Sequence, residues 1–279
     1  MPHTARLLVI DPQNDFMDCE GAALPVAGAT ADMQRTAALV DALGAGLADI
    51  VVTLDSHANY GIERTTFWTD AQGRPAPPFT EITAAACAAG RWRPRAAGRP
   101  GHEGLAAEVL GYLQALESGG RHTLMVWPVH CVLGTWGHNI APPLAAALAR
   151  WEERHSRVVE RVLKGRNPLT EQYSALRAEV PRADDPATGM HQALLARLVA
   201  GALPLLVAGE ASSHCVAATM EDAFAHMGPD QLARTVVLTD AMSPVAGFEA
   251  AAQTFLERAR ARGVQLMDTA EAARRFAAG

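Results

Sequence analysis

The chain alternates short apolar runs, rich in β-branched residues, with longer stretches rich in alanine and leucine that carry a helical period. Such alternation predicts strand–helix units with parallel strands, because each helix returns the chain to the same end of the sheet. We therefore expect an α/β fold, with a Rossmann-like parallel sheet of about six strands and helices on both faces. In such sheets reactive residues collect at the carboxyl ends of the strands.

The bounds of the expected strands and helices follow from the length and composition of each run and from the residues at its ends. Strands are expected at residues 6–10, 50–54, 122–127, 157–162, 204–208 and 235–239. Helices are expected at residues 31–47, 142–154, 188–200, 214–227 and 247–262. A last helix is expected after Asp268, whose side chain can cap its first turn.

Residues 61–120 interrupt this alternation between the second and third expected strands. Residues 70–101 are rich in proline, glycine, alanine and arginine, and only residues 105–116 have a clear helical pattern. Loops of this length are usually functional or disordered. We interpret the segment as an insertion into a single domain spanning residues 1–279, where it covers the site or builds a subunit interface. A homo-oligomer is expected.

Composition excludes several classes of partner. The chain is 49% hydrophobic with a net charge of −6 and a pI near 5.9, so no basic surface for nucleic acid is expected. No apolar run approaches the roughly 18 residues of a membrane-spanning helix. Four cysteines without close pairing favour reduced thiols, and no signal peptide is evident. We expect a cytoplasmic protein that acts on a small molecule, without nucleic acid or membrane partners.

Cys215 is the candidate nucleophile. It lies where an expected strand turns into an expected helix, and the dipole of a helix N-terminus favours thiolate and lowers the thiol pKa. The free N–H groups of that turn can also hold an oxyanion. Cys131 has a similar local sequence, but Gly134 and Pro142 follow it, so we expect a packed core cysteine there. A buried, inert thiol is the alternative for Cys215 as well.

Asp11 and Lys164 end two other expected strands. A carboxylate at Asp11 can accept the thiol proton and deliver it to a leaving nitrogen, although an Asx-turn is an alternative role. Lys164 is the only lysine among 24 basic residues. A compact ammonium at that position can hold both Asp11 and Cys215 in their charged forms.

A second group has the character of a metal site. Asp55 and His57 continue one expected strand and point to the same side of it. With His130 they offer one carboxylate and two imidazoles, which suit Zn²⁺, Fe²⁺ or Mn²⁺. Glu63 is a further candidate ligand. The alternative is that these histidines are only hydrogen-bonded.

Taken together, these segments resemble the nicotinamidase/isochorismatase-like cysteine hydrolase family, most closely its nicotinamidase branch. Several motifs carry the resemblance, and they recur in the expected order. They are residues 8–16, 55–57, 127–132, 164–165 with 173–174, and 209–216.

The resemblance implies an isochorismatase-like hydrolase fold that converts nicotinamide to nicotinate and ammonia through a thioester. It implies one divalent metal ion and no organic cofactor. It also implies a cis peptide at Glu210–Ala211 that aims backbone N–H groups at an oxyanion. The residues implied are the triad Asp11, Lys164 and Cys215, the metal ligands Asp55, His57 and His130, and Phe16 and Trp127 against an aromatic ring.

Two alternatives remain at this stage. The long insertion adjoins the metal loop, so the pocket could admit a different or larger amide. One alternative is therefore a metal-independent family hydrolase of another carbamoyl, ureido or aliphatic amide. A catalytically idle member of the family, serving as a binding or scaffold subunit, is the other.

Overall fold

A six-stranded sheet forms the centre of the computed structural model, which describes residues 4–277. Its order is β10-β9-β8-β1-β2-β7, and every neighbouring pair is parallel. The expected α/β class and the parallel sheet are therefore confirmed. The strands are β1 (Ala5–Ile10), β2 (Leu47–Asp55), β7 (Glu160–Lys164), β8 (Leu205–Gly209), β9 (Thr235–Leu238) and β10 (Gln265–Met267).

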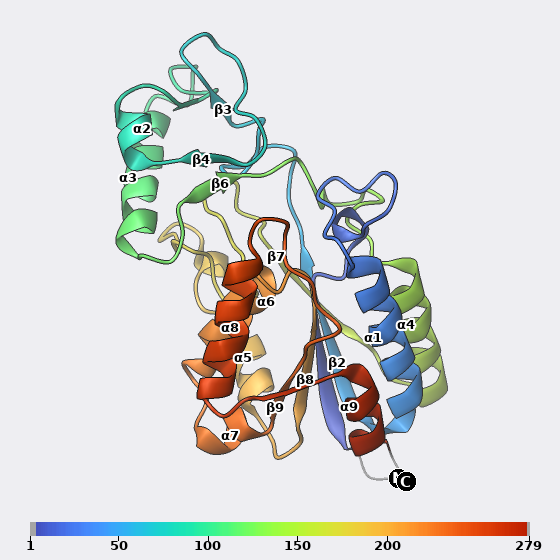
Figure 1. The fold of residues 1–279 in the computed structure, drawn as a ribbon. Helices are drawn as coiled ribbons and strands as arrows, with labels where there is room; N and C mark the ends of the chain where they lie inside the picture. Colours follow the sequence, from blue (N-terminus) through green and yellow to red (C-terminus); the bar gives the residue numbers. More distant parts are fainter. Residues whose placement is uncertain (1–3, 278–279) are drawn as a thin grey trace.

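Helices cover both faces of this sheet (Figure 1). One layer contains α1 (Ala29–Leu43), α4 (Pro142–His155) and α9 (Thr269–Phe276). The other contains α5 (Gln192–Val199), α6 (Cys215–Phe224), α7 (Pro229–Ala233) and α8 (Glu249–Ala261). The central strands β1 and β8 are almost wholly buried, because apolar side chains on both their faces pack against helices. Short 3₁₀ helices span Asn14–Phe16, Gly44–Gly46 and Pro186–Thr188.

The sequence predictions misplaced some of these elements. The expected strand at residues 122–127 shrinks to β6 (Leu124–Val126), which pairs antiparallel with β4 (Thr80–Ile82) outside the main sheet. Because the insertion supplies that partner strand, β6 pairs with β4 and does not join the central sheet. The sixth strand is instead β10, a three-residue edge strand that the sequence did not reveal. The first helix also ends early, at Leu43, because Gly44 turns the chain with φ +46°.

The insertion forms a small folded unit of its own. It contains β3 (Trp68–Thr69), α2 (Ala84–Ala88), β5 (Arg93–Pro94) and α3 (Leu105–Ser118), besides β4. Figure 1 shows it projecting beyond the end of the sheet at which β2 finishes. A separate hydrophobic cluster holds it together, including Ile62, Phe67, Trp68, Ile82 and Leu113.

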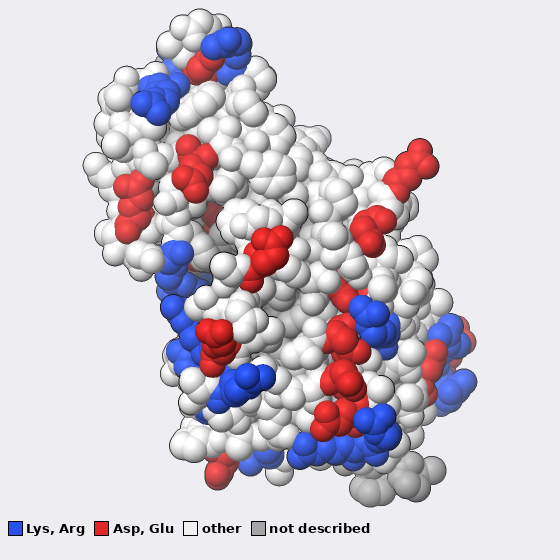
Figure 2. All heavy atoms as spheres, viewed as in Figure 1, with Lys and Arg blue, Asp and Glu red and all other residues white. Residues whose placement is uncertain are grey.

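Most of the face shown in Figure 2 is uncharged, and acidic and basic side chains lie beside one another mainly in its lower part. Some exposed arginines pair with acids, as Arg150 does with Asp41 and Arg262 with Glu221. Among the described residues, no helix has both the length and the apolarity needed to cross a bilayer.

Candidate active site

Asp11, Lys164 and Cys215 meet at the carboxyl edge of the sheet. Asp11 follows β1, Lys164 ends β7, and Cys215 begins α6 just after β8. Nζ of Lys164 lies 2.9 Å from Oδ2 of Asp11 and 3.5 Å from Sγ of Cys215. All three side chains are buried. The structure thus brings together three residues that are distant in sequence. Even the nearest two, Lys164 and Cys215, are 51 positions apart.

Local backbone geometry sets these positions. Asp11 has φ +46°, and its Oδ1 accepts a 2.6 Å hydrogen bond from Oγ1 of Thr53. Gly209, at the end of β8, has φ +123°, and a Cβ there would lie 2.0 Å from the carbonyl oxygen of Ile10. Only glycine therefore lets β8 approach β1 closely enough to place the nucleophile turn beside Asp11.

The expected low thiol pKa is not what the structure shows. Burial raises the pKa of the Cys215 thiol well above its usual value, and the charges of Asp11 and Asp55 add to the effect, while Lys164 opposes it. The helix end predicted from sequence is present, but two carboxylates already surround the single ammonium. The raised pKa favours the thiol form of Cys215, so attack by the sulfur requires a proton acceptor.

Asp11 is placed to take that proton. Its Oδ2 is ion-paired with Lys164 but has no aligned hydrogen bond in the described structure. Burial raises the pKa of Asp11 above its usual value, while the neighbouring Lys164 pulls it down. Lys164 stays charged, because Asp11 and Asp55 outweigh the effect of burial and raise its pKa. Because the pKa of its carboxyl is raised, Asp11 is a suitable acceptor for the proton of the neighbouring Cys215 thiol.

The turn before Cys215 presents two free backbone donors. The Glu210–Ala211 peptide is cis, as the resemblance implied. The N–H groups of Ala211 and Cys215 have no acceptor within the part of the chain that the structure describes. Buried N–H groups are rarely left without a partner, and two of them beside a nucleophile suit a developing oxyanion.

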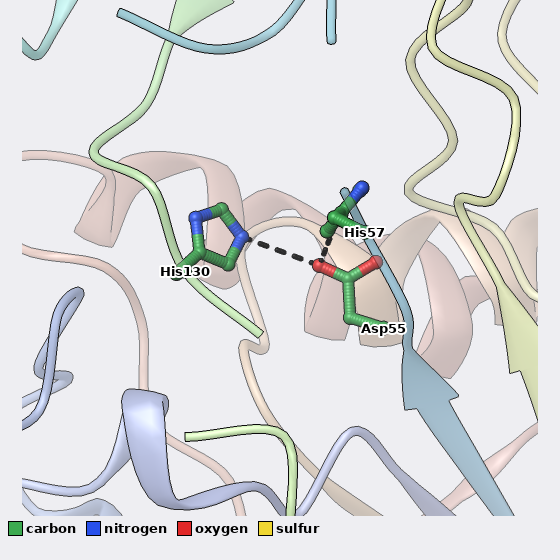
Figure 3. Close-up of side chains that lie close together, drawn as sticks. All are labelled: Asp55, His57 and His130. Carbon is green, nitrogen blue, oxygen red and sulfur yellow. Dashed lines mark hydrogen bonds and ion pairs between the residues drawn. The ribbon is translucent and has the colours of Figure 1, made fainter. Parts of the chain in front are cut away.

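Asp55, His57 and His130 converge next to this group (Figure 3). Their ligand atoms all lie within 4.8 Å of one another, and all three residues are buried. Oδ2 of Asp55 lies 2.8 Å from Nε2 of His57 and 3.3 Å from Nε2 of His130. Burial, with Arg64 nearby, lowers the pKa of His130 to about 3, so its imidazole is neutral. One carboxylate and two imidazoles of this kind fit a divalent transition metal.

Glu63, the further candidate ligand, lies on the other side of His57. Its Oε1 is 3.3 Å from Nδ1 of His57, whereas Asp55 faces Nε2 of the same ring. Glu63 is not part of the group whose ligand atoms converge. A carboxylate in this place orients a metal-binding imidazole through the ring nitrogen that the metal leaves free.

Arg64 is a site residue that sequence reasoning missed. It is fully buried, donates from Nε to Oε1 of Glu63 at 2.8 Å, and places Nη1 2.7 Å from Nδ1 of His130. Its only signal in the sequence was its place beside Glu63. The pair Glu63 and Arg64 contacts the outer ring nitrogen of each histidine and so fixes both rings.

A small, mostly apolar pocket opens onto these groups. Phe16 and Trp127, predicted from the resemblance, both line it. Trp127 donates from Nε1 to the hydroxyl of Tyr173 at 3.1 Å, and Phe79 of the insertion packs edge-on against its ring. The lining also includes Leu24, Asp55, His130, Glu171, Tyr173, Ala211, His214, Cys215 and Val245.

Comparisons with solved structures support the fold. A yeast nicotinamidase bound to the inhibitor nicotinaldehyde shares 20% identity, with a TM-score of 0.63, covering 96% of this chain and 100% of that one. An Acinetobacter baumanii nicotinamidase/pyrazinamidase shares 20%, with a TM-score of 0.63 and coverage of 98% and 99%. This chain has the nicotinamidase fold. A Pyrococcus horikoshii pyrazinamidase in complex with zinc shares 19%, with a TM-score of 0.51 and coverage of 95% and 99%.

The likeness is one of structure and not of sequence. No protein-family model matches the chain, and no curated protein matches it. At these identities the solved structures establish the nicotinamidase fold and its extent along nearly the whole chain.

Proposed function

We propose that the protein is a metal-dependent cysteine amidohydrolase that converts nicotinamide to nicotinate and ammonia. The observation that carries the proposal is the contact of one ammonium, Lys164, with Asp11, Asp55 and Cys215, the last two of which line an aromatic pocket. The yeast and Acinetobacter structures named above, both nicotinamidases, support the choice of substrate.

The first half of the reaction forms a thioester. Cys215 passes its proton to Asp11 as Sγ adds to the amide carbonyl carbon. The oxyanion accepts hydrogen bonds from the N–H groups of Ala211 and Cys215. When the carbonyl re-forms, the C–N bond breaks, and Asp11 returns the proton to the departing nitrogen, which leaves as ammonia.

The second half consumes one water. Asp11 is again ionised and accepts a proton from water as the water oxygen adds to the thioester carbonyl carbon. Collapse of this intermediate breaks the C–S bond, releases the acid and restores the Cys215 thiol with the proton held by Asp11. Lys164 remains charged throughout and compensates the negative charge that moves between Asp11 and Cys215.

Asp55, His57 and His130 would hold the divalent metal, with Glu63 and Arg64 behind the two histidine rings. Bound there, the metal supplies a Lewis acid beside the pocket that can anchor a ring nitrogen of the substrate. The pyrazinamidase in complex with zinc, among the solved structures above, supports zinc as the first metal to test. A cytoplasmic location and a homo-oligomeric state remain predictions.

Ammonia release across a panel of small amides, with nicotinamide first, tests the proposal. We expect release by the metal-loaded protein and none by Cys215→Ala, which should keep its fold by circular dichroism. Equal activity on aliphatic amides in metal-free protein would instead favour the metal-independent alternative. Sluggish alkylation of Cys215 at every pH, with no turnover of any amide, would favour an idle scaffold.

A further inference from the structure

Glu210 carries a fully buried carboxyl group, and no basic side chain among residues 4–277 pairs with it. It follows β8 and precedes Ala211 in the nucleophile turn. Its Oε2 accepts a 3.1 Å hydrogen bond from the backbone N–H of Ser243, and its Oε1 has no partner in the described structure. A buried carboxylate without a compensating charge is costly, so this group favours its neutral form.

Asp32 of α1 reaches the same serine from the other side. Its Oδ2 accepts a 2.6 Å hydrogen bond from Oγ of Ser243, and its Oδ1 pairs with Arg35 at 2.5 Å. Burial and the charge of the nearby Asp32 raise the pKa of Glu210 well above its usual value. Two neighbouring buried carboxyl groups cannot both stay ionised without compensating positive charge. Arg35 compensates Asp32, which also accepts from Ser243, so Glu210 is the carboxyl that stays neutral.

Among the described residues, no other charged neighbour compensates a negative charge on Glu210. Asp18, in the loop before α1, adds a further negative charge that raises the Glu210 pKa. Asp240, after β9, faces Arg35 with its backbone oxygen and its side chain. Arg35 is therefore the one basic group that the structure pairs with this cluster, and it contacts Asp32 and Asp240 and not Glu210.

Ser243 connects the two carboxyls to the nucleophile turn. Its backbone oxygen accepts a 2.9 Å hydrogen bond from the N–H of Ser212, and Oγ of Ser213 accepts one of 3.0 Å from the N–H of Val245. Val245 also lines the pocket. The segment held by Glu210 and Asp32 therefore fixes the residues just before Cys215 and one wall of the substrate pocket.

We propose that Glu210 is a positioning residue: its neutral carboxyl accepts from the backbone N–H of Ser243 while Asp32 accepts from the hydroxyl of the same serine, and together they hold Ser243 so that the turn before Cys215 keeps its geometry. The inference deepens the proposed function, since it concerns the same nucleophile. Its readouts do not depend on knowing the substrate.

Two substitutions separate a hydrogen-bonding role from simple space filling. Glu210→Gln stays uncharged and keeps an acceptor for the Ser243 N–H, whereas Glu210→Leu removes that acceptor at similar size. Glu249→Gln, on an exposed residue of α8, is the matched control. We expect the rate of Cys215 alkylation by iodoacetamide to stay within about twofold in Glu210→Gln and to fall about tenfold in Glu210→Leu, because small displacements of a reacting group are costly.

An infrared difference spectrum tests the proton directly and needs only the folded glutamine variant. Wild type minus Glu210→Gln at neutral pH should contain the carbonyl stretch of a protonated carboxylic acid, and wild type minus Glu249→Gln should not. Absence of that band from the first spectrum, or a glutamine variant with alkylation as slow as the leucine variant, would overturn the inference. If both readouts agree with it but no amide is hydrolysed, the proposed function fails and the positioning role stands.

Discussion

The ammonium of Lys164 lies 2.9 Å from Oδ1 of Asp55, whose other oxygen faces the two histidines of the metal group. Asp55 therefore belongs to both halves of the site. Any change in charge at the metal position alters how much of the Lys164 charge is left for Asp11 and Cys215. We therefore expect the reactivity of Cys215 to depend on whether a metal is bound, with Asp55 as the link between them.

Metal removal should therefore slow the alkylation of the Cys215 thiol. The uncompensated charge of Asp55 is one of the causes that raise the Cys215 pKa. Chelation should move the pH profile of Cys215 alkylation to higher pH, with roughly a tenfold loss of rate per pKa unit at a fixed pH. Iodoacetamide labelling followed by peptide mass spectrometry measures this. A pH profile unaffected by chelation would show that the metal position does not influence the reactivity of Cys215.

Gly165 offers a test of the metal group through the backbone. It has φ +72°, and a Cβ there would lie 2.7 Å from Cε1 of His57. Gly165→Ala should weaken zinc binding, because the methyl group must displace the His57 ring. Gly201→Ala is the matched control, with φ +77° and no atom within 4 Å of its Cβ. Both variants should lose about 1 kcal/mol of stability from backbone strain, but only the first should lose metal affinity in zinc titrations.

Glu63→Gln tests whether that carboxylate orients His57. The substitution keeps the size of the side chain and removes the charge next to Nδ1 of His57 and Nε of Arg64. We expect a loss of about tenfold to a hundredfold in zinc affinity, as for other partners of metal-bound histidines. Glu81→Gln, exposed in the same insertion, should leave zinc affinity unchanged. Equal affinities in all three proteins would assign Glu63 a purely structural role.

The pH dependence of turnover follows from Asp11. It must be ionised to accept the thiol proton, and burial raises its pKa above the usual 3.8. The value of kcat/KM should therefore fall as pH decreases through this raised pKa. Asp11→Asn should abolish that acid limb and lower kcat by roughly a hundredfold or more. A wild-type profile that stays flat down to about pH 4 would contradict the assignment.

The sequence predicted the fold class and the residues at strand ends because both are local properties. Asp11, Lys164 and Cys215 each follow an apolar run, and parallel strands bring their carboxyl ends to one edge. Strand order is not local. The mistake over residues 122–127 arose because an apolar run does not reveal its partner, and here the insertion provides one.

The electrostatic state of the site was beyond the sequence for a different reason. A helix N-terminus lowers a thiol pKa, but burial and two nearby carboxylates oppose it, and these depend on residues brought together only in the fold. Arg64 and the joint contact of Glu210 and Asp32 with Ser243 escaped notice for the same reason. Each has a role only because of a neighbour that is distant in sequence.

The proposed mechanism requires that Cys215, assisted by Asp11 and Lys164, becomes covalently acylated during amide hydrolysis. Acid quenching of the metal-loaded protein during turnover of nicotinamide, followed by peptide mass spectrometry, detects such an intermediate. We expect a nicotinoyl group on the peptide that contains Cys215, and none on the peptide with Cys131. Ammonia release that continues in Cys215→Ala, or an acyl group found only on another residue, would contradict it.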